Sequence, residues 1–333
     1  MSDWLSNKFR WLSLIATWAV VCIHSRTDRW AGDVEDYASR IEANIADLFH
    51  FAVPLFFVIS GYMFVRSYEK YGWGGVLCRK FKSLYVPMVI WSILGLIVCL
   101  PIRIYTHHDV PTMIDLCKLP LMLFRLESVH FWYVRALIFL FIAAPLMACV
   151  ARNSWLAFLL IIAALLIPVD SWAALVHVPV SVMFFVLGAL LVRVNTVVLC
   201  GEGSMRWLGF WLSLVGLVLA FFFKREITNH YFSVLFEPLF MIGVLWFGYD
   251  IVDTKFRIGK FPEGLNVLFF VYCMHLIVIC WCGGVMRIVF GVSPVSRLCG
   301  YFVLWLTFWI DIAVANVVQR QFPRVFALLS GGR

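Results

Sequence analysis

Long apolar runs recur along the whole chain, and they constrain its fold more than any other feature of the sequence. A helix of about 20 predominantly apolar residues crosses the hydrocarbon core of a bilayer. None of the runs alternates strictly between apolar and polar residues, as a strand of a membrane barrel would. We therefore predict an all-α membrane protein, a polytopic bundle of about ten transmembrane helices. The runs lie at about residues 8–24, 48–65, 84–104, 131–150, 155–169, 177–192, 207–223, 232–249, 265–285 and 297–317.

The composition is typical of a membrane protein rather than a soluble one. Hydrophobic residues make up 63% of the 333 residues and charged residues 14%, against roughly 25% charged residues in an average soluble domain. Internal repeats and low-complexity linkers are not evident, so we predict one membrane-embedded domain over residues 1–333. Residues 112–129 hold a Leu/Met-rich stretch between charges, which predicts an amphipathic helix lying on the membrane surface.

The distribution of positive charge predicts how the helices are oriented. Most of the 27 Lys and Arg residues, Lys8 among them, fall in cytoplasmic segments if the N-terminus is cytoplasmic. Because cytoplasmic loops carry an excess of Lys and Arg, we predict that the N-terminus and the C-terminus are both cytoplasmic. The formal net charge of +8 then favours membrane lipids or a polyanionic ligand as partners. No nucleic-acid-binding module is evident, so nucleic acid is not an expected partner.

Several ionisable side chains lie in or at the edge of the apolar runs. They are His24, His130, Arg135, Glu237 and His275. An ionisable group at the centre of a bilayer costs about 2.5–3.5 kcal/mol on insertion scales, so each of these residues is a functional candidate. The 10 cysteines lie mostly inside apolar runs, where a thiol behaves as a small hydrophobe. We therefore expect no metal site.

Five local strings follow His24 in an order that resembles one family. Together with the His24 helix they resemble the acyltransferase-3 family of integral membrane acyltransferases, over about residues 8–318. Each string alone is weak evidence, because apolar helices are built from the same few residue types. The order of the strings along the chain is specific. The strings are PLFFVISGYMF (Pro54–Phe64), RKFKSLYVPMVIW (Arg79–Trp91), HFWYVRALIFLF (His130–Phe141), VMFFVLGALL (Val182–Leu191) and FVYCMHLIVI (Phe270–Ile279).

The resemblance implies an activity, substrates and a location. It implies the transfer of an acyl group, commonly acetyl from acetyl-coenzyme A, to a hydroxyl of a sugar or surface-glycan unit. Acyl-coenzyme A would then be a co-substrate rather than a bound cofactor, and the acceptor would be a glycan or a lipid-linked sugar. The expected location is the cytoplasmic (inner) membrane of a bacterium. The identity of the acceptor, the length of the acyl chain, the oligomeric state and the existence of a covalent intermediate stay open.

Acyl transfer to an alcohol needs a base, because an alcohol is a poor nucleophile at neutral pH. Histidine is the side chain whose ordinary pKa lies nearest to neutrality. We expect His24 to accept the hydroxyl proton and return it to the departing thiolate; the alternative is a histidine that hydrogen-bonds a headgroup or carbonyl at a helix end. Glu127 and Glu237 are candidates to hold the imidazole in one tautomer, or structural hydrogen-bonding carboxylates. His130 is the remaining catalytic candidate.

Other residues near these positions are candidates for binding substrate. Trp132 is either a stacking platform for a sugar ring or an interfacial anchor. Arg135 binds an anionic substrate group such as a phosphate, or pairs with an acid such as Glu237. Tyr272 and His275 share a helical face at the i, i+3 spacing, where they either meet substrate or pack against a neighbouring helix.

The predicted orientation separates a donor side from an acceptor side. Arg79, Lys80 and Lys82 fall at the cytoplasmic mouth, where charge-assisted bonds can hold the phosphates of coenzyme A. Ser83 stands where the family often has another cation. His24 falls toward the outer half of the membrane, so we expect the acceptor to enter from the outside or laterally from the bilayer.

One departure from the family pattern leaves the activity open. The family's first helix usually carries a basic residue eleven positions before the histidine, and this chain has Ser13 there. Arg10, one turn earlier, is the expected substitute, because a long guanidinium stem can extend along an apolar surface. The alternatives are altered donor handling and a catalytically degenerate relative. A membrane transporter of an acyl donor or polar lipid-linked unit is the other function class, although no matching pair of broken helices indicates an inverted repeat.

Overall fold

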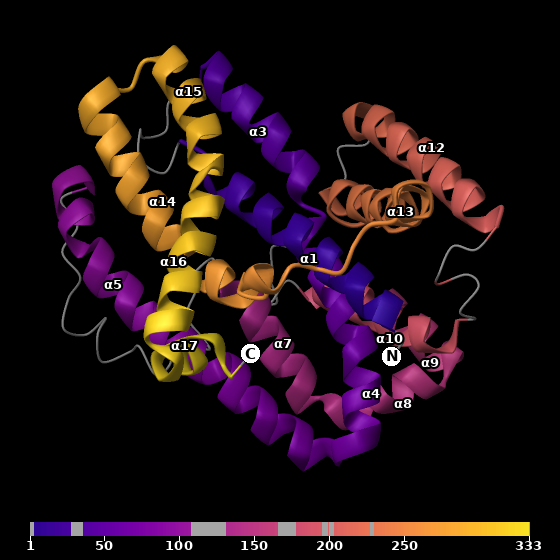
Figure 1. The fold of residues 1–333 in the computed structure, drawn as a ribbon. Helices are drawn as coiled ribbons and strands as arrows, with labels where there is room; N and C mark the ends of the chain where they lie inside the picture. The colour runs from indigo at the N-terminus through magenta and orange to yellow at the C-terminus, as the bar shows by residue number, and fades with distance from the viewer. Residues whose placement is uncertain are drawn as a thin grey trace. The chain divides into compact units, whose positions relative to one another are not determined.

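The computed structural model describes residues 3–27, 36–107, 131–165, 178–194, 199, 203–226 and 230–332. Within these residues every regular element is a helix and none is a strand, so the all-α prediction is confirmed there (Figure 1). The elements are α1 (Asp3–His24), α3 (Tyr37–Phe49), α4 (Ala52–Lys80), η1 (Phe81–Tyr85), α5 (Val86–His107), α7 (Trp132–Ile142), α8 (Ala144–Arg152), α9 (Ser154–Leu165), α10 (Val178–Leu190), η5 (Leu191–Arg193), α12 (Met205–Glu226), α13 (His230–Phe256), η6 (Glu263–Leu265), α14 (Leu268–Phe290), α15 (Pro294–Trp305), α16 (Thr307–Gln321) and α17 (Pro323–Ser330).

The described helices include several that can cross a membrane. Five helical stretches are long and apolar enough, and a sixth is added if α7 and α8 form one broken span. Each of the ten predicted apolar runs coincides with at least one helix, while ten crossings and the cytoplasmic termini stay predictions. The five stretches are Tyr37–Cys99, Met205–Phe222, Leu235–Phe256, Leu268–Phe290 and Pro294–Gln321.

One predicted span is broken rather than continuous. Helices α7 and α8 cover the predicted run 131–150 but meet at an angle of 77°. Pro145 stands in the first turn of α8, where its fixed φ suits a helix start and its missing N–H would disrupt a helix interior. The predicted run 297–317 is shared by α15 and α16, which together form the single stretch Pro294–Gln321. The predicted surface helix at 112–129 lies outside the described residues.

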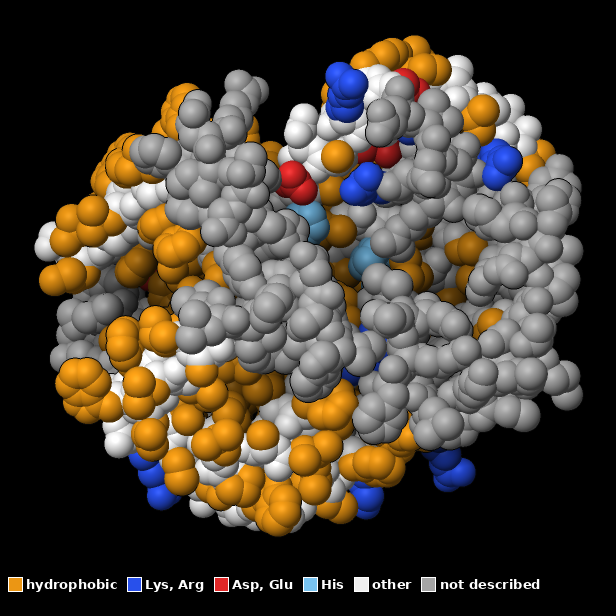
Figure 2. All heavy atoms as spheres, turned by 180° about the vertical axis from the view of Figure 1, so that it is seen from behind, with side chains coloured by type: hydrophobic (Ala, Val, Ile, Leu, Met, Phe, Trp, Pro, Cys, Tyr) orange, Lys and Arg blue, Asp and Glu red, His pale blue; other side chains and the backbone are white. Residues whose placement is uncertain are grey.

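Large apolar side chains cover much of the surface of the described residues, as the orange atoms in Figure 2 show. Trp155 is 77% exposed, Phe256 69% and Phe222 68%. Soluble monomers rarely expose contiguous apolar areas of this kind, whereas a bilayer solvates them. We conclude that the chain is an integral membrane protein.

The chain divides into two compact units. The first unit comprises Met1–Ala16, His50–Cys78 and Phe139–Glu263, and the second comprises Thr17–Phe49, Arg79–Ile138 and Gly264–Arg333. Helices α1, α4 and α7 each contribute to both units. The single membrane-embedded domain stays a prediction.

The first unit is held together by a helix crossing and by a buried ion pair. A Cβ atom on Gly61 would collide with the carbonyl of Phe185, and one on Gly188 would collide with the carbonyl of Val58. Glycine is therefore what lets α4 and α10 touch backbone to backbone, the packing that small residues permit between membrane helices. Lys8 donates hydrogen bonds of 2.8 Å to both carboxylate oxygens of Asp250, which fixes the start of α1 to α13.

The second unit has its core around α14, which packs against α5, α15, α16 and α17. The ring of Phe270 lies between Trp91, at a centroid distance of 5.0 Å, and Phe326, at 5.3 Å. The Trp91 indole donates to the carbonyl of Leu329 at 2.9 Å, which satisfies its one polar group inside an apolar core. These contacts fix α14, the helix that carries Tyr272 and His275.

Candidate active site

Two histidines from distant parts of the sequence lie next to each other in the second unit. His24 is the last residue of α1, and His275 lies in α14. Their ring centroids are 5.1 Å apart, and the ring planes are inclined by 38°. His275 is fully buried, whereas His24 is half-buried with its Nδ1 atom enclosed, so His24 is the more exposed member of the pair. We call them the histidine pair.

A backbone contact fixes the orientation of the buried ring. His275 Nδ1 lies 2.6 Å from the carbonyl oxygen of Tyr272. A carbonyl can only accept a hydrogen bond, so the proton must be on Nδ1, which in the neutral ring makes Nε2 an acceptor. The i, i+3 spacing of Tyr272 and His275 therefore has a structural consequence, because the turn that they share sets one tautomer.

Aromatic rings and a guanidinium surround this turn of α14. Tyr272 contacts Phe131 at a centroid distance of 6.3 Å and Tyr133 at 5.9 Å, both edge to face. Arg135 is 2% exposed, and its guanidinium lies close enough to Tyr272 to interact electrostatically with it. Near the histidine pair, the second unit thus brings together a buried cation and a largely apolar wall.

The residues just after His24 are held by a buried polar network. The Thr27 N–H donates to Glu42 at 2.8 Å, and the Thr27 hydroxyl donates to the same carboxylate at 2.7 Å. The guanidinium of Arg297 donates from Nε to the Thr27 hydroxyl and from Nη1 to Asp36, each at 3.1 Å. Thr27, Glu42 and Arg297 are all fully buried. We call these four residues the Thr27 network, and it anchors the chain three residues beyond His24.

Asp36 also begins the helix that carries Glu42. Its carboxylate accepts from the N–H of Ser39 at 2.9 Å, and its own N–H donates to the Ser39 hydroxyl at 3.0 Å. This reciprocal pair satisfies two backbone donors at the start of α3. The hydrogen bond from the Ser39 N–H, followed by the nearby Arg297 charge, holds the pKa of Asp36 below its ordinary value.

The remaining predicted site residues are distributed over both units. In the second unit, Trp132 is half-buried at the start of α7, and the basic cluster at the end of α4 and in η1 is accessible, since Arg79 and Lys82 are exposed and Lys80 is half-buried. In the first unit, Arg10 is exposed on α1, and Glu237 is half-buried in α13. The predicted roles of these residues stay predictions. Glu127 and His130 lie outside the described residues.

The sequence did not indicate the Thr27 network. Thr27 and Arg297 are 270 residues apart, and a threonine in a loop carries no pattern that names a partner. The only signal was an arginine at the start of an apolar run. Among the residues that the structure describes, no group of three or more His, Cys, Asp or Glu could hold a metal ion.

Comparison with known proteins places the chain in a family. A family model described as an acyltransferase domain, of the acyltransferase-3 type, matches residues 7–315. The searches of curated proteins and of solved structures each found no significant match. The matched segment covers most of the 333 residues, so the chain belongs to the acyltransferase-3 family. Its membership and its apolar helices identify an integral membrane protein of acyltransferase type.

Proposed function

We propose that this member of the acyltransferase-3 family transfers an acyl group, commonly acetyl, from acyl-coenzyme A to a hydroxyl of a sugar or surface-glycan unit. The observation that carries the proposal is the histidine pair, in which a half-buried imidazole lies against a buried one of fixed tautomer. Ionisable groups within membrane-spanning segments mark functional sites by default.

The reaction proceeds by general base catalysis at His24. The imidazole accepts the acceptor's hydroxyl proton as the oxygen attacks the thioester carbonyl carbon. A tetrahedral intermediate forms and then breaks its carbon–sulfur bond. The imidazolium returns the proton to the departing sulfur, so that an ester and free coenzyme A leave and His24 is neutral again. A positioned base of this kind contributes about 10²–10⁴-fold to the rate.

His275 supports this step by holding one tautomer beside His24, with the two ring centroids 5.1 Å apart. Because the Nδ1 proton of His275 is engaged by the Tyr272 carbonyl, the ring keeps one tautomer while His24 gains and loses its proton. Arg135, buried beside Tyr272, supplies positive charge for an anionic substrate group.

The donor's phosphates bind the basic cluster of Arg79, Lys80 and Lys82. These cations are accessible at the end of α4 and in η1, where charge-assisted bonds to phosphate are strong. Replacing Lys80 and Lys82 by Gln should raise the KM for acetyl-coenzyme A about tenfold and leave acceptor binding unchanged. An unchanged donor KM would count against this part of the proposal.

The proposed location is the cytoplasmic membrane of a bacterium, with both termini inside. The acyl donor would then reach the protein from the cytoplasm, and the acceptor from the outside or from the bilayer. Protease accessibility of tags at the two ends, in sealed vesicles of known orientation, tests this arrangement. A tag cleaved from the outer side would contradict it.

The experiment that tests the function uses the purified full chain and acetyl-coenzyme A labelled in the acetyl group. Labelled ester should form on glycan extracted from the native host. His24→Ala should lower the rate at least about a hundredfold, whereas His50→Ala, at an exposed histidine, should leave it unchanged. Equal rates in the two variants would refute the role of His24. Transmembrane movement of substrate without any ester formation would instead identify a transporter.

A further inference from the structure

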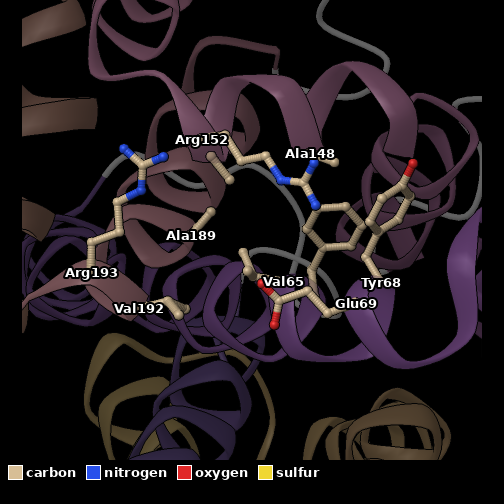
Figure 3. Close-up of a pocket in the computed structure, with 10 residues that line it drawn as sticks. Val65, Tyr68, Glu69, Ala148, Arg152, Ala189, Val192 and Arg193 are labelled. Atoms are coloured by element: carbon tan, nitrogen blue, oxygen red, sulfur yellow. The ribbon is translucent and has the colours of Figure 1, made fainter.

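The first unit contains a cavity that none of the proposed site residues lines. It has a volume of about 90 Å³ and lies between α4, α8 and the α10–η5 segment. Figure 3 shows the guanidinium of Arg193 at the left, that of Arg152 apart from it toward Tyr68, and Glu69 below them on α4. Phe64, Tyr68 and several small apolar side chains complete the lining.

The backbone explains why this cavity exists. Helices α4 and α10 touch at Gly61 and Gly188, and the cavity opens on the C-terminal side of this crossing in both helices. Tyr68 lies seven residues beyond Gly61, about 10 Å along the helix on the same face. On the α10–η5 segment Ala189 and Val192 line the cavity, and neither is large enough to close it. The site is therefore built by the helix crossing and does not depend on a loop.

The two arginines beside the cavity form no hydrogen bond or ion pair with a described residue that would stabilise the fold. Neither the Arg152 nor the Arg193 guanidinium hydrogen-bonds or pairs with any residue that the structure describes. Both arginines are the last residues of their helices, where a cation also complements the helix dipole. That role needs only a charge near the helix end, and it does not account for two guanidinium groups that line one cavity opposite a carboxylate.

The chemistry of the lining selects a class of ligand. We infer that this cavity binds a phosphate ester that carries a hydrogen-bond donor, such as an amine or hydroxyl, close to its phosphate. Guanidinium groups bind phosphate oxygens in a bidentate geometry, and Glu69 accepts from the neighbouring donor. A water molecule needs about 10–15 Å³ of such a cavity, so its volume suits a phosphate with a short arm rather than a whole nucleotide.

Two sources can supply this ligand chemistry. One is a lipid headgroup, since phosphatidylethanolamine and phosphatidylglycerol each carry a donor beside their phosphate. The other is a soluble phosphate ester, for which coenzyme A and inorganic phosphate serve as probes. The predicted orientation places Arg152 and Arg193 on the cytoplasmic side, where both sources are present. The inference does not depend on acyl transfer, because it concerns binding and is tested without turnover.

The test measures binding to the full chain in dodecyl maltoside, a detergent without phosphate. The variant is Arg152→Gln/Arg193→Gln, and the matched control is Arg320→Gln/Arg324→Gln, which removes two exposed arginines elsewhere. Native mass spectrometry counts bound phosphatidylethanolamine and phosphatidylglycerol, and calorimetry measures coenzyme A and inorganic phosphate. The pocket variant should bind at least one of these probes about tenfold or more weakly than the control variant does.

The outcomes separate the two sources. Loss of lipid binding alone identifies a headgroup site, and loss of coenzyme A affinity identifies a soluble ester. Glu69→Gln should then weaken phosphatidylethanolamine more than inorganic phosphate. Affinities for all four probes equal to those of the control variant would overturn the inference.

A second measurement needs no variant. Phenylglyoxal modifies accessible arginines, and both pocket arginines are exposed. The probe that binds should protect Arg152 and Arg193, read as peptide masses, but not Arg320. Equal modification of all three arginines with every probe would also overturn the inference.

Discussion

Replacing Lys8 by Met is expected to destabilise the first unit by about 3–5 kcal/mol, the usual cost of removing one partner from a buried ion pair. Lys8 and Asp250 are 0% and 2% exposed. The ammonium donates to both oxygens of Asp250 at 2.8 Å and to the carbonyl of Leu199 at 3.3 Å. Methionine keeps the apolar stem of the side chain but leaves the Asp250 carboxylate buried without its cation.

The expected loss of stability depends on the burial of the Lys8–Asp250 ion pair, and two further variants test that dependence. Arg10→Met removes an exposed cation two residues away on α1 and should change the stability by less than about 0.5 kcal/mol. Lys8→Met combined with Asp250→Leu removes both charges, and it should recover most of the loss, because hydrophobic replacement of a whole buried pair is often neutral or stabilising.

Tryptophan fluorescence during unfolding in mixed micelles measures these differences directly. The Lys8 ammonium lies 4.2 Å from the ring centroid of Trp246 and 5.0 Å from that of Trp4, so both indoles report on the site. A Lys8→Met variant as stable as Arg10→Met would refute the account, as would a double variant no more stable than the single one.

Three other predictions concern the helix crossing and the Thr27 network. Gly188→Ala would force a Cβ into the carbonyl of Val58 and should cost about 1–3 kcal/mol by the same fluorescence assay; equal loss in Gly259→Ala, where a Cβ meets open space, would contradict it. Thr27→Val should lower kcat about tenfold with the donor KM unchanged, measured by release of coenzyme A, and a change in KM alone would argue against positioning of His24. Folding lowers the pKa of Asp36 below its ordinary value of 3.8. The ionised Asp36 carboxylate therefore stabilises the fold fully above pH 3.8, and this stabilisation is lost as the pH falls through the lower pKa of the folded state. The difference in melting temperature between the wild type and Asp36→Asn should thus stay constant between about pH 5 and 8 and vanish in stronger acid; a difference that changes near neutrality would contradict this assignment.

The sequence predicted the helices better than it predicted their partners. Apolar periodicity and length indicate a helix without any tertiary information, and each predicted run contains one. Lys8 shows what this reasoning misses. The charge distribution predicts a cytoplasmic cation at this position, yet Lys8 is buried against Asp250, 242 residues away. The break between α7 and α8 could have been predicted from Pro145, whose missing N–H argues against one continuous helix.

In the candidate site, too, the sequence identifies individual residues but not the contacts between residues far apart in the chain. Arg135, Tyr272 and His275 each stood out as polar groups in apolar runs, and the structure brings them together in one unit, with His24 against His275. Placing a polar or ionisable side chain in lipid costs free energy, so its presence in an apolar run marks it as a functional candidate. The contact between His24 and His275 joins residues far apart in the chain, so only the fold could supply it.

A double-mutant cycle on the histidine pair tests the central claim most directly. The rates of acetyl transfer are measured for the wild type, His24→Ala, His275→Ala and the double variant. Residues that act as a unit show strongly non-additive effects, so the double variant should be within about twofold of His24→Ala. Effects of the two substitutions that multiply, or full activity in His24→Ala, would contradict the account.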